Sequence, residues 1–137
     1  MKKKQLWIGC LLVLALIIVF SDVKAQTESP WALRLIRNFG YGAGTDIQGN
    51  MSLYLDGDLG SVVKVVYYMD DKVMAEVTQE PFKLPFTTDD YEPGVHKMRA
   101  EISSTDGKIT PAGPIVYNFL SAVESGKKTT SILTTVI

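Results

Sequence analysis

The sequence predicts an all-β fold, a β-sandwich of about seven antiparallel strands. Short runs of alternating apolar and polar residues recur about every ten residues, turn-forming residues separate them, and no helical periodicity follows residue 25. The clearest run is 94–103, in which His96, Met98, Ala100 and Ile102 share one face. Successive side chains of a strand point to opposite sides of a sheet, so this run is expected to be half-buried.

The same alternation predicts the other strands. Their ranges are 29–38, 47–55, 62–69, 72–78, 82–86 and 115–119. The side chains expected to face inward are Trp31, Leu33, Leu35, Ile47, Gly49, Met51, Leu53, Leu55, Val63, Val65, Tyr67, Met69, Val73, Ala75, Val77, Phe82, Leu84, Phe86, Ile115, Tyr117 and Phe119. Because Pro85 has no N–H to donate, its strand is expected at a sheet edge. Pro93-Gly94 and Asp106-Gly107 indicate tight turns on either side of the clearest run.

The first 25 residues have the layout of a secretory signal peptide. Lys2, Lys3 and Lys4 are followed by an apolar run of 15 residues, 6–20, and by Val23-Lys24-Ala25 before Gln26. An uncleaved anchor begins in the same way, but the apolar run is shorter than the roughly 20 residues of a spanning helix. We therefore expect cleavage before Gln26 and export of the remainder.

Removal of residues 1–25 leaves 112 of the 137 residues, which is the size of one domain. The 14 basic and 15 acidic residues of the chain become 10 and 14, a net charge of −4, which argues against a nucleic-acid partner. The single cysteine, Cys10, lies in the predicted signal peptide. The exported part would therefore have no disulfide, no thiol nucleophile and no cysteine-ligated metal.

The C-terminal residues 122–137 are expected to form a linker that leads to an apolar segment. The stretch up to Thr130 is polar, with Lys127 and Lys128, and residues 131–137 then become apolar. We interpret this segment as the beginning of a truncated transmembrane helix that continues beyond Ile137, with a frayed tail as the alternative. The predicted organisation is thus a signal peptide at 1–25, a sandwich at 26–121, and this linker and helix start at 122–137.

Residues 47–119 also conform to a sequence pattern of turns and strands. A Val-x-Tyr strand leads through an Asp turn to a short strand, a Pro-Phe pair, a threonine, and Pro-Gly-x-His before an alternating strand that ends in Asp-Gly. The residues at these places are Val65, Tyr67, Asp70, Pro81, Phe82, Thr87, Pro93, Gly94, His96, Ala100, Asp106 and Gly107. In this the chain resembles a bacterial immunoglobulin-like domain. The resemblance implies an immunoglobulin-like sandwich and no particular activity, because such modules serve as spacers, adhesion units and enzyme appendages.

Catalytic, metal-binding and cofactor-binding residues are not predicted. The only histidine, His96, begins a strand on its inward side after a Pro-Gly turn, so a hydrogen-bonded structural role is favoured over a general base. Gly40-x-Gly42-x-Gly44 lacks the Lys-Ser/Thr of a phosphate-binding loop and opens no helix, which favours an irregular loop or bulge over residues 39–46.

Paired carboxylates and outward aromatics are the remaining candidates for ligand sites. The carboxylate pairs Asp56/Asp58, Asp70/Asp71 and Asp89/Asp90 occur where turns are expected, and Asp56-Gly57-Asp58 lacks the other ligands of a calcium loop. Aromatic side chains available to stack on sugars are Tyr54 and Tyr68 on strands and Tyr41 and Tyr91 in loops. The best carbohydrate site would combine Tyr41, Asp46 and Tyr91. Asn50-Met51-Ser52 is a formal N-glycosylation sequon.

The sequence therefore predicts a non-catalytic, exported, immunoglobulin-like module. It would act at the cell surface as a spacer or protein-interaction domain, with a protein or cell-surface component as partner and a membrane tether through a helix beyond Ile137. The alternative is a carbohydrate-binding accessory module of a secreted system. The two differ in surface, because the alternative requires aromatic and carboxylate side chains on one contiguous face.

Overall fold

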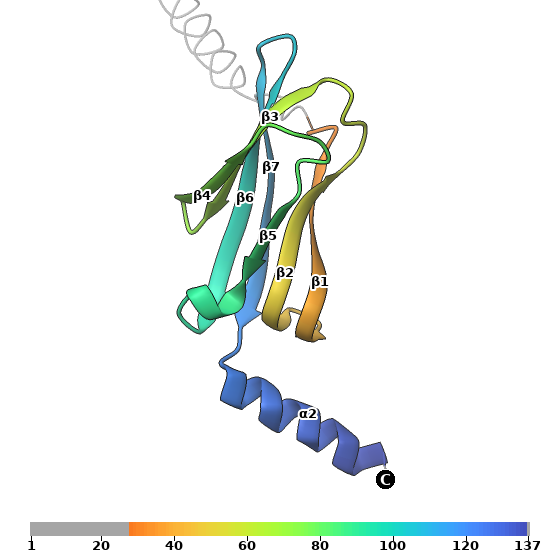
Figure 1. Cartoon of the computed structure of the whole chain (residues 1–137), viewed down its shortest axis with the longest axis vertical. Coiled ribbons are helices and arrows are strands. Elements are labelled where there is room, and N and C mark those ends of the chain that lie inside the picture. The colour runs from red at the N-terminus through yellow and green to blue at the C-terminus, as the bar shows by residue number, and fades with distance from the viewer. Residues whose placement is uncertain (1–27, 137) are drawn as a thin grey trace, which may run out of the picture.

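The structure is a computed structural model and describes residues 28–136, so the predicted signal peptide lies outside the described residues. Within the described residues, seven strands, one short 3-10 helix and one α-helix succeed one another (Figure 1). The strands are β1 (Ala32–Ala43), β2 (Asp46–Asp56), β3 (Val62–Met69), β4 (Lys72–Val77), β5 (Leu84–Thr87), β6 (Gly94–Ser104) and β7 (Ile109–Phe119). The helices are η1 (Thr88–Asp90) and α2 (Ala122–Val136).

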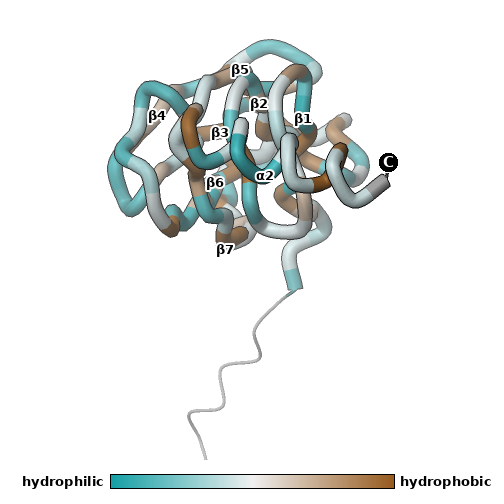
Figure 2. The backbone as a smooth tube through the Cα atoms, turned by 90° about the horizontal axis from the view of Figure 1, so that it is seen from below, coloured by the Kyte–Doolittle hydropathy of each residue, from teal (hydrophilic) through white to brown (hydrophobic). Residues whose placement is uncertain are grey.

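The seven strands form a curled sheet with two antiparallel layers. One layer has the order β1-β2-β5 and the other β7-β6-β3-β4. A two-residue parallel pairing, Asp46 with Asn118 and Ile47 with Phe119, connects the layers. Seen along the strands, β5, β2 and β1 lie in sequence on one side, with β6 and β7 across from them (Figure 2). The predicted immunoglobulin-like sandwich is confirmed.

The core lies between the layers and takes the inward faces of the strands from both. In β6, Met98, Ala100 and Ile102 have no exposed surface, as the alternation predicted. Met51 and Leu53 of β2 and Val65 and Tyr67 of β3 are also completely buried. Each such large side chain contributes about 1.5–3 kcal/mol to folding by its burial. This core includes no disulfide, since the only cysteine lies outside the described residues.

Bulges shift the predicted inward face in β3 and β4. Val63 was expected to be buried but is 50% exposed, because the pairing with β6 shifts between Val62 and Lys64 and places Val62 inside instead. Val73 was likewise expected inside and is 62% exposed. Here the pairing with β3 skips Met74, which packs against the core. An extra residue in one strand reverses the side on which its neighbours point.

The glycine-rich segment is a hairpin and not the irregular loop that was expected. β1 continues through a bulge at Asn38 as far as Ala43, and the chain turns at Gly44-Thr45. Gly40 lies directly opposite Gly49 of β2. The expected bulge is confirmed, whereas the expected loop is wrong.

The start of β7 differs from the prediction, whereas the edge position of β5 agrees with it. β7 begins at Ile109 and not at residue 115, and the register with β6 shifts in its middle, around Gly113. β5 pairs only with β2 among the described strands, so the strand that contains Pro85 lies at an edge as predicted. The turn at Asp106-Gly107 is confirmed, because the backbone N–H of Gly107 donates to the carbonyl of Ser104. At the other end of β6, Pro93 lies in a bend and Gly94 is already the first residue of the strand.

The C-terminal segment that was expected to begin as a linker is an α-helix. α2 starts directly after Ser121, whose hydroxyl accepts a hydrogen bond from the backbone N–H of Glu124, while Oε2 of Glu124 accepts one from the backbone N–H of Ser121. This reciprocal arrangement is a capping box, which the Ser-x-x-Glu sequence encodes. No helix of the described residues is long and apolar enough to cross a membrane. A membrane span that continues from α2 stays a prediction.

Candidate functional site

One pole of the sandwich gathers the only histidine, three loops and an aromatic cluster. His96, near the start of β6, holds both neighbouring loops through its two ring nitrogens. Nδ1 lies 2.6 Å from Oδ2 of Asp70 in the β3–β4 turn, and Nε2 lies 2.6 Å from the backbone carbonyl of Glu92. A neutral imidazole donates only one hydrogen bond, so two acceptors at this distance favour the imidazolium form.

The β3–β4 turn that meets His96 has an unusual backbone. Asp70 and Asp71 have positive φ values of 48° and 65°, as in the two-residue hairpin turns in which both central residues are left-handed. The second carboxylate oxygen of Asp70 accepts a hydrogen bond of 2.9 Å from the backbone N–H of Lys97. The Asp70 carboxylate thus ties the turn to β6 at two points.

The contacts at this pole shift the pKa values of both His96 and Asp70. Burial disfavours the charged imidazole, but the Glu92 carbonyl and the Asp70 carboxylate outweigh it and raise the pKa of His96 above its usual value. The backbone N–H of Lys97 and the His96 ring lower the pKa of Asp70, against a smaller effect of burial. Each group therefore favours the charged form of the other.

The raised pKa of His96 predicts a pH-dependent stability. The imidazolium stabilises the folded state fully below the unfolded pKa of about 6.5, and this stabilisation is lost as the pH rises through the higher folded pKa. The Asp70 carboxylate also stabilises the folded state, but its pH dependence is reversed. Its contribution is lost only as the pH falls through the lowered pKa of Asp70. We expect the melting temperature to fall between neutral and mildly alkaline pH and the fall to shrink in His96→Gln. Identical pH profiles of the two proteins would contradict the imidazolium assignment.

Aromatic rings close the same pole. The His96 ring lies 4.4 Å from that of Phe119, and Tyr91 packs edge-on against both rings and against Phe86. Such edge-to-face pairs are worth about 0.5–1.5 kcal/mol beyond their burial. The predicted structural role of His96 agrees with these contacts.

An open pocket of about 710 Å³ adjoins this cluster, between β4 and the segment from η1 to β6. Met69, Met74 and Tyr91 supply apolar lining. Its carboxylates come from both sides, and they are Asp70, Asp89, Asp90 and Glu92. Lys72 is the only lysine or arginine that lines it. The lining includes one histidine and four carboxylates but no serine, threonine or cysteine, so a serine- or cysteine-type nucleophile–base pair is not among these residues.

A second group of polar side chains lies on the outer face of β3 and β6, in the same layer as β4. The guanidinium of Arg99 lies 3.8 Å above the Tyr68 ring and forms ion pairs with Asp71 and Glu101. The Tyr68 hydroxyl donates a 3.0 Å hydrogen bond to Glu101. The hydrogen bonds from Arg99 and Tyr68 lower the pKa of Glu101. Every charge of this group already has a partner within the protein.

The carboxylates of the predicted pairs make turn contacts at some positions and contacts with other strands at others. Asp58 accepts from the backbone N–H of Gly60, and Asp89 accepts from the side chain of Gln48. Arg34 forms an exposed ion pair with Asp56. No three histidine, cysteine, aspartate or glutamate side chains of the described region come close enough to hold a metal ion.

The residues proposed for carbohydrate binding do not form a free aromatic platform. Tyr54 and Tyr68 lie in β2 and β3, which belong to different layers, and Arg99 covers one face of the Tyr68 ring. Tyr91 is packed in the aromatic cluster. Asp46 accepts a hydrogen bond from Asn118 and forms an ion pair with Lys128 of α2. Asn50 of the sequon lies in the middle of β2, which pairs on both sides.

α2 is attached to the sandwich by polar contacts that the sequence did not reveal. Besides the Lys128–Asp46 pair, the Ser125 hydroxyl lies 3.3 Å from Oε1 of Gln48, whose Nε2 donates to Asp89 of η1. In each of the two contacts between α2 and the sandwich, the two residues are 77 or more positions apart in the sequence. No local sequence pattern could therefore have predicted these contacts. Figure 1 shows α2 leaving this pole and pointing away from the strands.

Comparisons with known proteins identify no family for this chain. No family model matches the sequence, and no curated protein matches it significantly. Among solved structures, that of the Clostridium thermocellum CbhA fibronectin(III)-like modules is similar, with a TM-score of 0.49 and 15% sequence identity. The similarity covers 64% of this chain and 45% of that chain, so it spans less than half of the CbhA structure.

Proposed function

We propose that this protein is a non-catalytic, exported immunoglobulin-like module that acts at the cell surface as a spacer and protein-contact domain. The placement of the two chain ends carries this proposal. Ala32, at the start of β1, pairs with Asp56, whereas α2 comes after β7 at the opposite pole, beside Asp46. The pole at the start of β1 and the pole at α2 are separated by the length of the sandwich, so the module would hold its β1 pole away from whatever α2 is attached to.

The attachment of α2 supports a defined orientation for such a spacer. Lys128 and Ser125 lie on successive turns of α2 and contact Asp46 and Gln48, which are two residues apart in β2. Two contacts at different heights along a helix restrict its direction more than one contact does. If α2 continues into a membrane anchor, the sandwich is presented at a fixed angle and with the β3–β4 and η1 loops near the anchor side.

The surface chemistry is consistent with contact rather than catalysis. The one histidine is engaged by a carboxylate and a carbonyl, and the charged residues around Tyr68 are paired with one another. The pocket at the pole of the predicted anchor has no serine, threonine or cysteine in its lining. The proposed role therefore needs only the shape and surface of the sandwich.

Localisation of the full-length product with N-terminal sequencing tests this proposal. We expect a mature chain that begins at Gln26, is found outside the cytoplasmic membrane, and requires detergent for release. A mature chain that begins at Gln26 but is freely soluble would remove the tether and keep export. A chain that retains Met1 and stays in the cytoplasm would overturn the proposal.

A further inference from the structure

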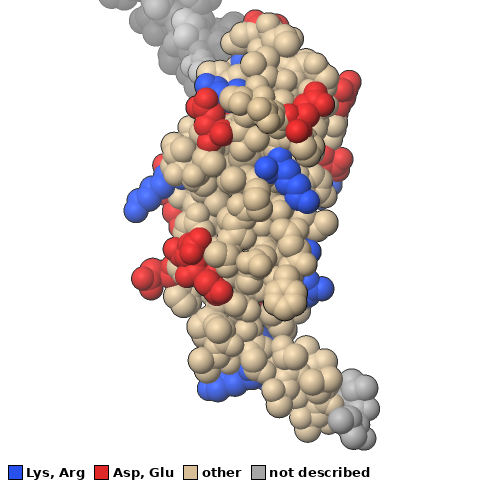
Figure 3. Space-filling model, in the orientation of Figure 1, with Lys and Arg blue, Asp and Glu red and all other residues tan. Residues whose placement is uncertain are grey.

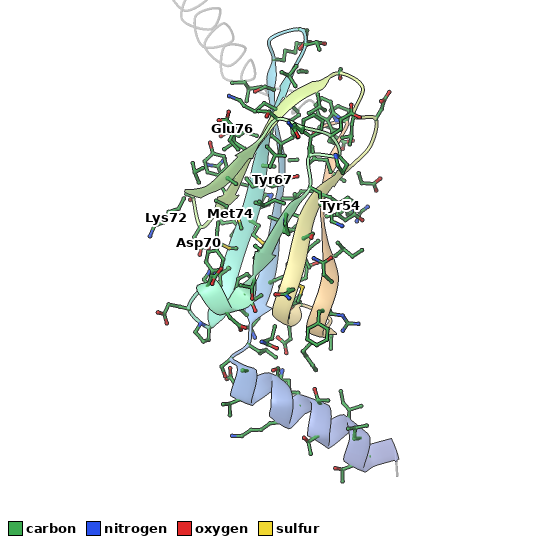
Figure 4. All side chains as sticks on the ribbon, viewed as in Figure 1. Tyr54, Tyr67, Asp70, Lys72, Met74 and Glu76 are labelled. Carbon is green, nitrogen blue, oxygen red and sulfur yellow. The ribbon has the colours of Figure 1, made fainter. Side chains whose placement is uncertain are left out.

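The free edge of β4 and the pocket beside it form one continuous surface. Among the described strands β4 pairs only with β3, so the backbone groups along its other edge have no strand partner. Figure 4 shows Asp70, Lys72, Met74 and Glu76 along this edge. Unpaired N–H and C=O groups of an edge strand are a template for an added strand.

The edge is irregular at the place where the pocket begins. The β3–β4 pairing skips Met74, which turns its side chain toward the core and lines the pocket, while the neighbouring Val73 is 62% exposed. A side chain of an added strand could therefore rest on Met74, Met69 and Tyr91. A backbone template with an adjoining apolar pocket is the combination by which strand-addition domains obtain both affinity and specificity.

The charge of the rim determines which occupant fits. Four carboxylates, one lysine and the imidazolium of His96 line the pocket, so its carboxylates outnumber its cations. Asp90 and Glu92 take part in no ion pair or side-chain hydrogen bond of the described residues. Both side chains belong to exposed residues. On the face seen in Figure 3, acidic side chains gather beside the lower end of β4, near η1. A cationic ligand would complement them.

From this surface we infer that β4 binds an extended, positively charged peptide segment of another protein, which adds as a strand and places one apolar side chain in the Met74 pocket. The segment would carry one apolar residue with basic residues two positions before and after it, so that all of them point to the same face. The apolar side chain would then face Met69 and Tyr91, and the basic side chains would face Asp90 and Glu92 of the same pocket. The inference specifies the protein-contact role proposed above, but its chemistry does not depend on where the protein resides.

The inference is tested with the full chain in detergent solution and two fluorescein-labelled peptides. One peptide is Lys-Thr-Lys-Thr-Leu-Thr-Lys-Thr-Lys, whose lysines and leucine share one strand face, and the other replaces every lysine with glutamate. We expect saturable binding of the basic peptide by fluorescence anisotropy and no binding of the acidic one. Hydrogen exchange of the β4 amides is expected to slow when the basic peptide is bound.

Two matched charge-reversal variants locate the binding. Asp90→Lys/Glu92→Lys changes the pocket rim and is expected to weaken binding by about tenfold or more. Glu28→Lys/Asp56→Lys makes the same change of charge at the opposite pole and is expected to leave the affinity within about twofold, since only distant charges change. Circular dichroism checks that both variants keep the fold, as their exposed positions predict.

The inference is overturned by equal binding of the two peptides, by equal weakening by the two variants, or by unchanged exchange of β4 amides in the complex. A chain that dimerises through β4 without peptide would also overturn it and assign the edge to a second copy. A cytoplasmic chain that binds the basic peptide would overturn only the proposed export, so the two failures are distinguishable.

Discussion

Met98→Asp is expected to unfold the protein or to leave it with little stability. Met98 has no exposed surface and lies on the inward face of β6, between the two layers. A carboxylate there would be buried with no partner, a change for which a loss of more than about 4 kcal/mol is expected. Since single domains are stable by roughly 5–15 kcal/mol, this loss consumes much or all of the margin. Chemical denaturation monitored by tryptophan fluorescence measures it.

Lys97→Asp is the matched control for this prediction. Lys97 precedes Met98 directly and its side chain is on the exposed face of the same strand. The same new carboxylate would remain in water, so a loss of about 1 kcal/mol or less is expected, from the low strand propensity of aspartate. Similar losses at the two positions would show that the face assignment of β6 is wrong.

Gly40→Ala is expected to give the second large loss, of about 3 kcal/mol or more. Gly40 has a φ of 120°, and a Cβ atom at this position would lie 2.1 Å from the backbone oxygen of Gln48 and 3.0 Å from the Cα of Gly49. These contacts are with backbone, which cannot rotate away as a side chain could. β1 and β2 would have to separate locally around Gly40 and Gly49, next to Asp46 and Gln48, which contact α2.

Gly44→Ala separates the effect of the close contact from that of the backbone angle. Gly44 also has a positive φ, 59°, but a Cβ atom there would meet nothing within 4 Å. Its expected cost is therefore only the roughly 1–2 kcal/mol of a left-handed alanine. The urea midpoints of the two variants give the comparison, and a Gly44→Ala loss as large as that of Gly40→Ala would contradict the close packing of the two strands.

The sequence was sufficient to predict strands wherever alternation was regular. The faces of β2 and β6 result from a period of two, and β5 was placed at an edge because Pro85 lacks an N–H. Val63 and Val73 were placed wrongly because each lies next to a bulge, where one extra residue reverses the faces. A bulge depends on the partner strand as well, and single-strand alternation does not contain that information.

The glycine-rich hairpin and α2 show two other limits. Three glycines in five residues are typical of a loop, but at Gly40 the glycine is needed because Gly49 lies opposite it in the paired strand. The part of α2 up to Thr130 was expected to be a linker because its glycine, serine and threonines obscure the helical period, although the Ser121-x-x-Glu124 capping box was present in the sequence. Its contacts with Asp46 and Gln48 depend on tertiary structure.

The candidate site was predictable only in part. The structural role of His96 was inferred from its inward position after a Pro-Gly turn, and its hydrogen bonds agree with that role. The partner Asp70 is 26 residues away in the sequence, so the pair required the β3–β6 register. The pocket beside Met74 could not be foreseen, because it depends on a bulge and on the position of η1 relative to β4.

Labelling of intact cells tests most directly whether this module is presented outside the cell. Because the only cysteine, Cys10, lies in the predicted signal peptide, Val73→Cys would place a single thiol on the exposed part of β4 of the mature chain. The account predicts that a membrane-impermeant maleimide labels this cysteine in intact cells, to the same extent as after lysis. Labelling only after lysis would contradict presentation at the surface.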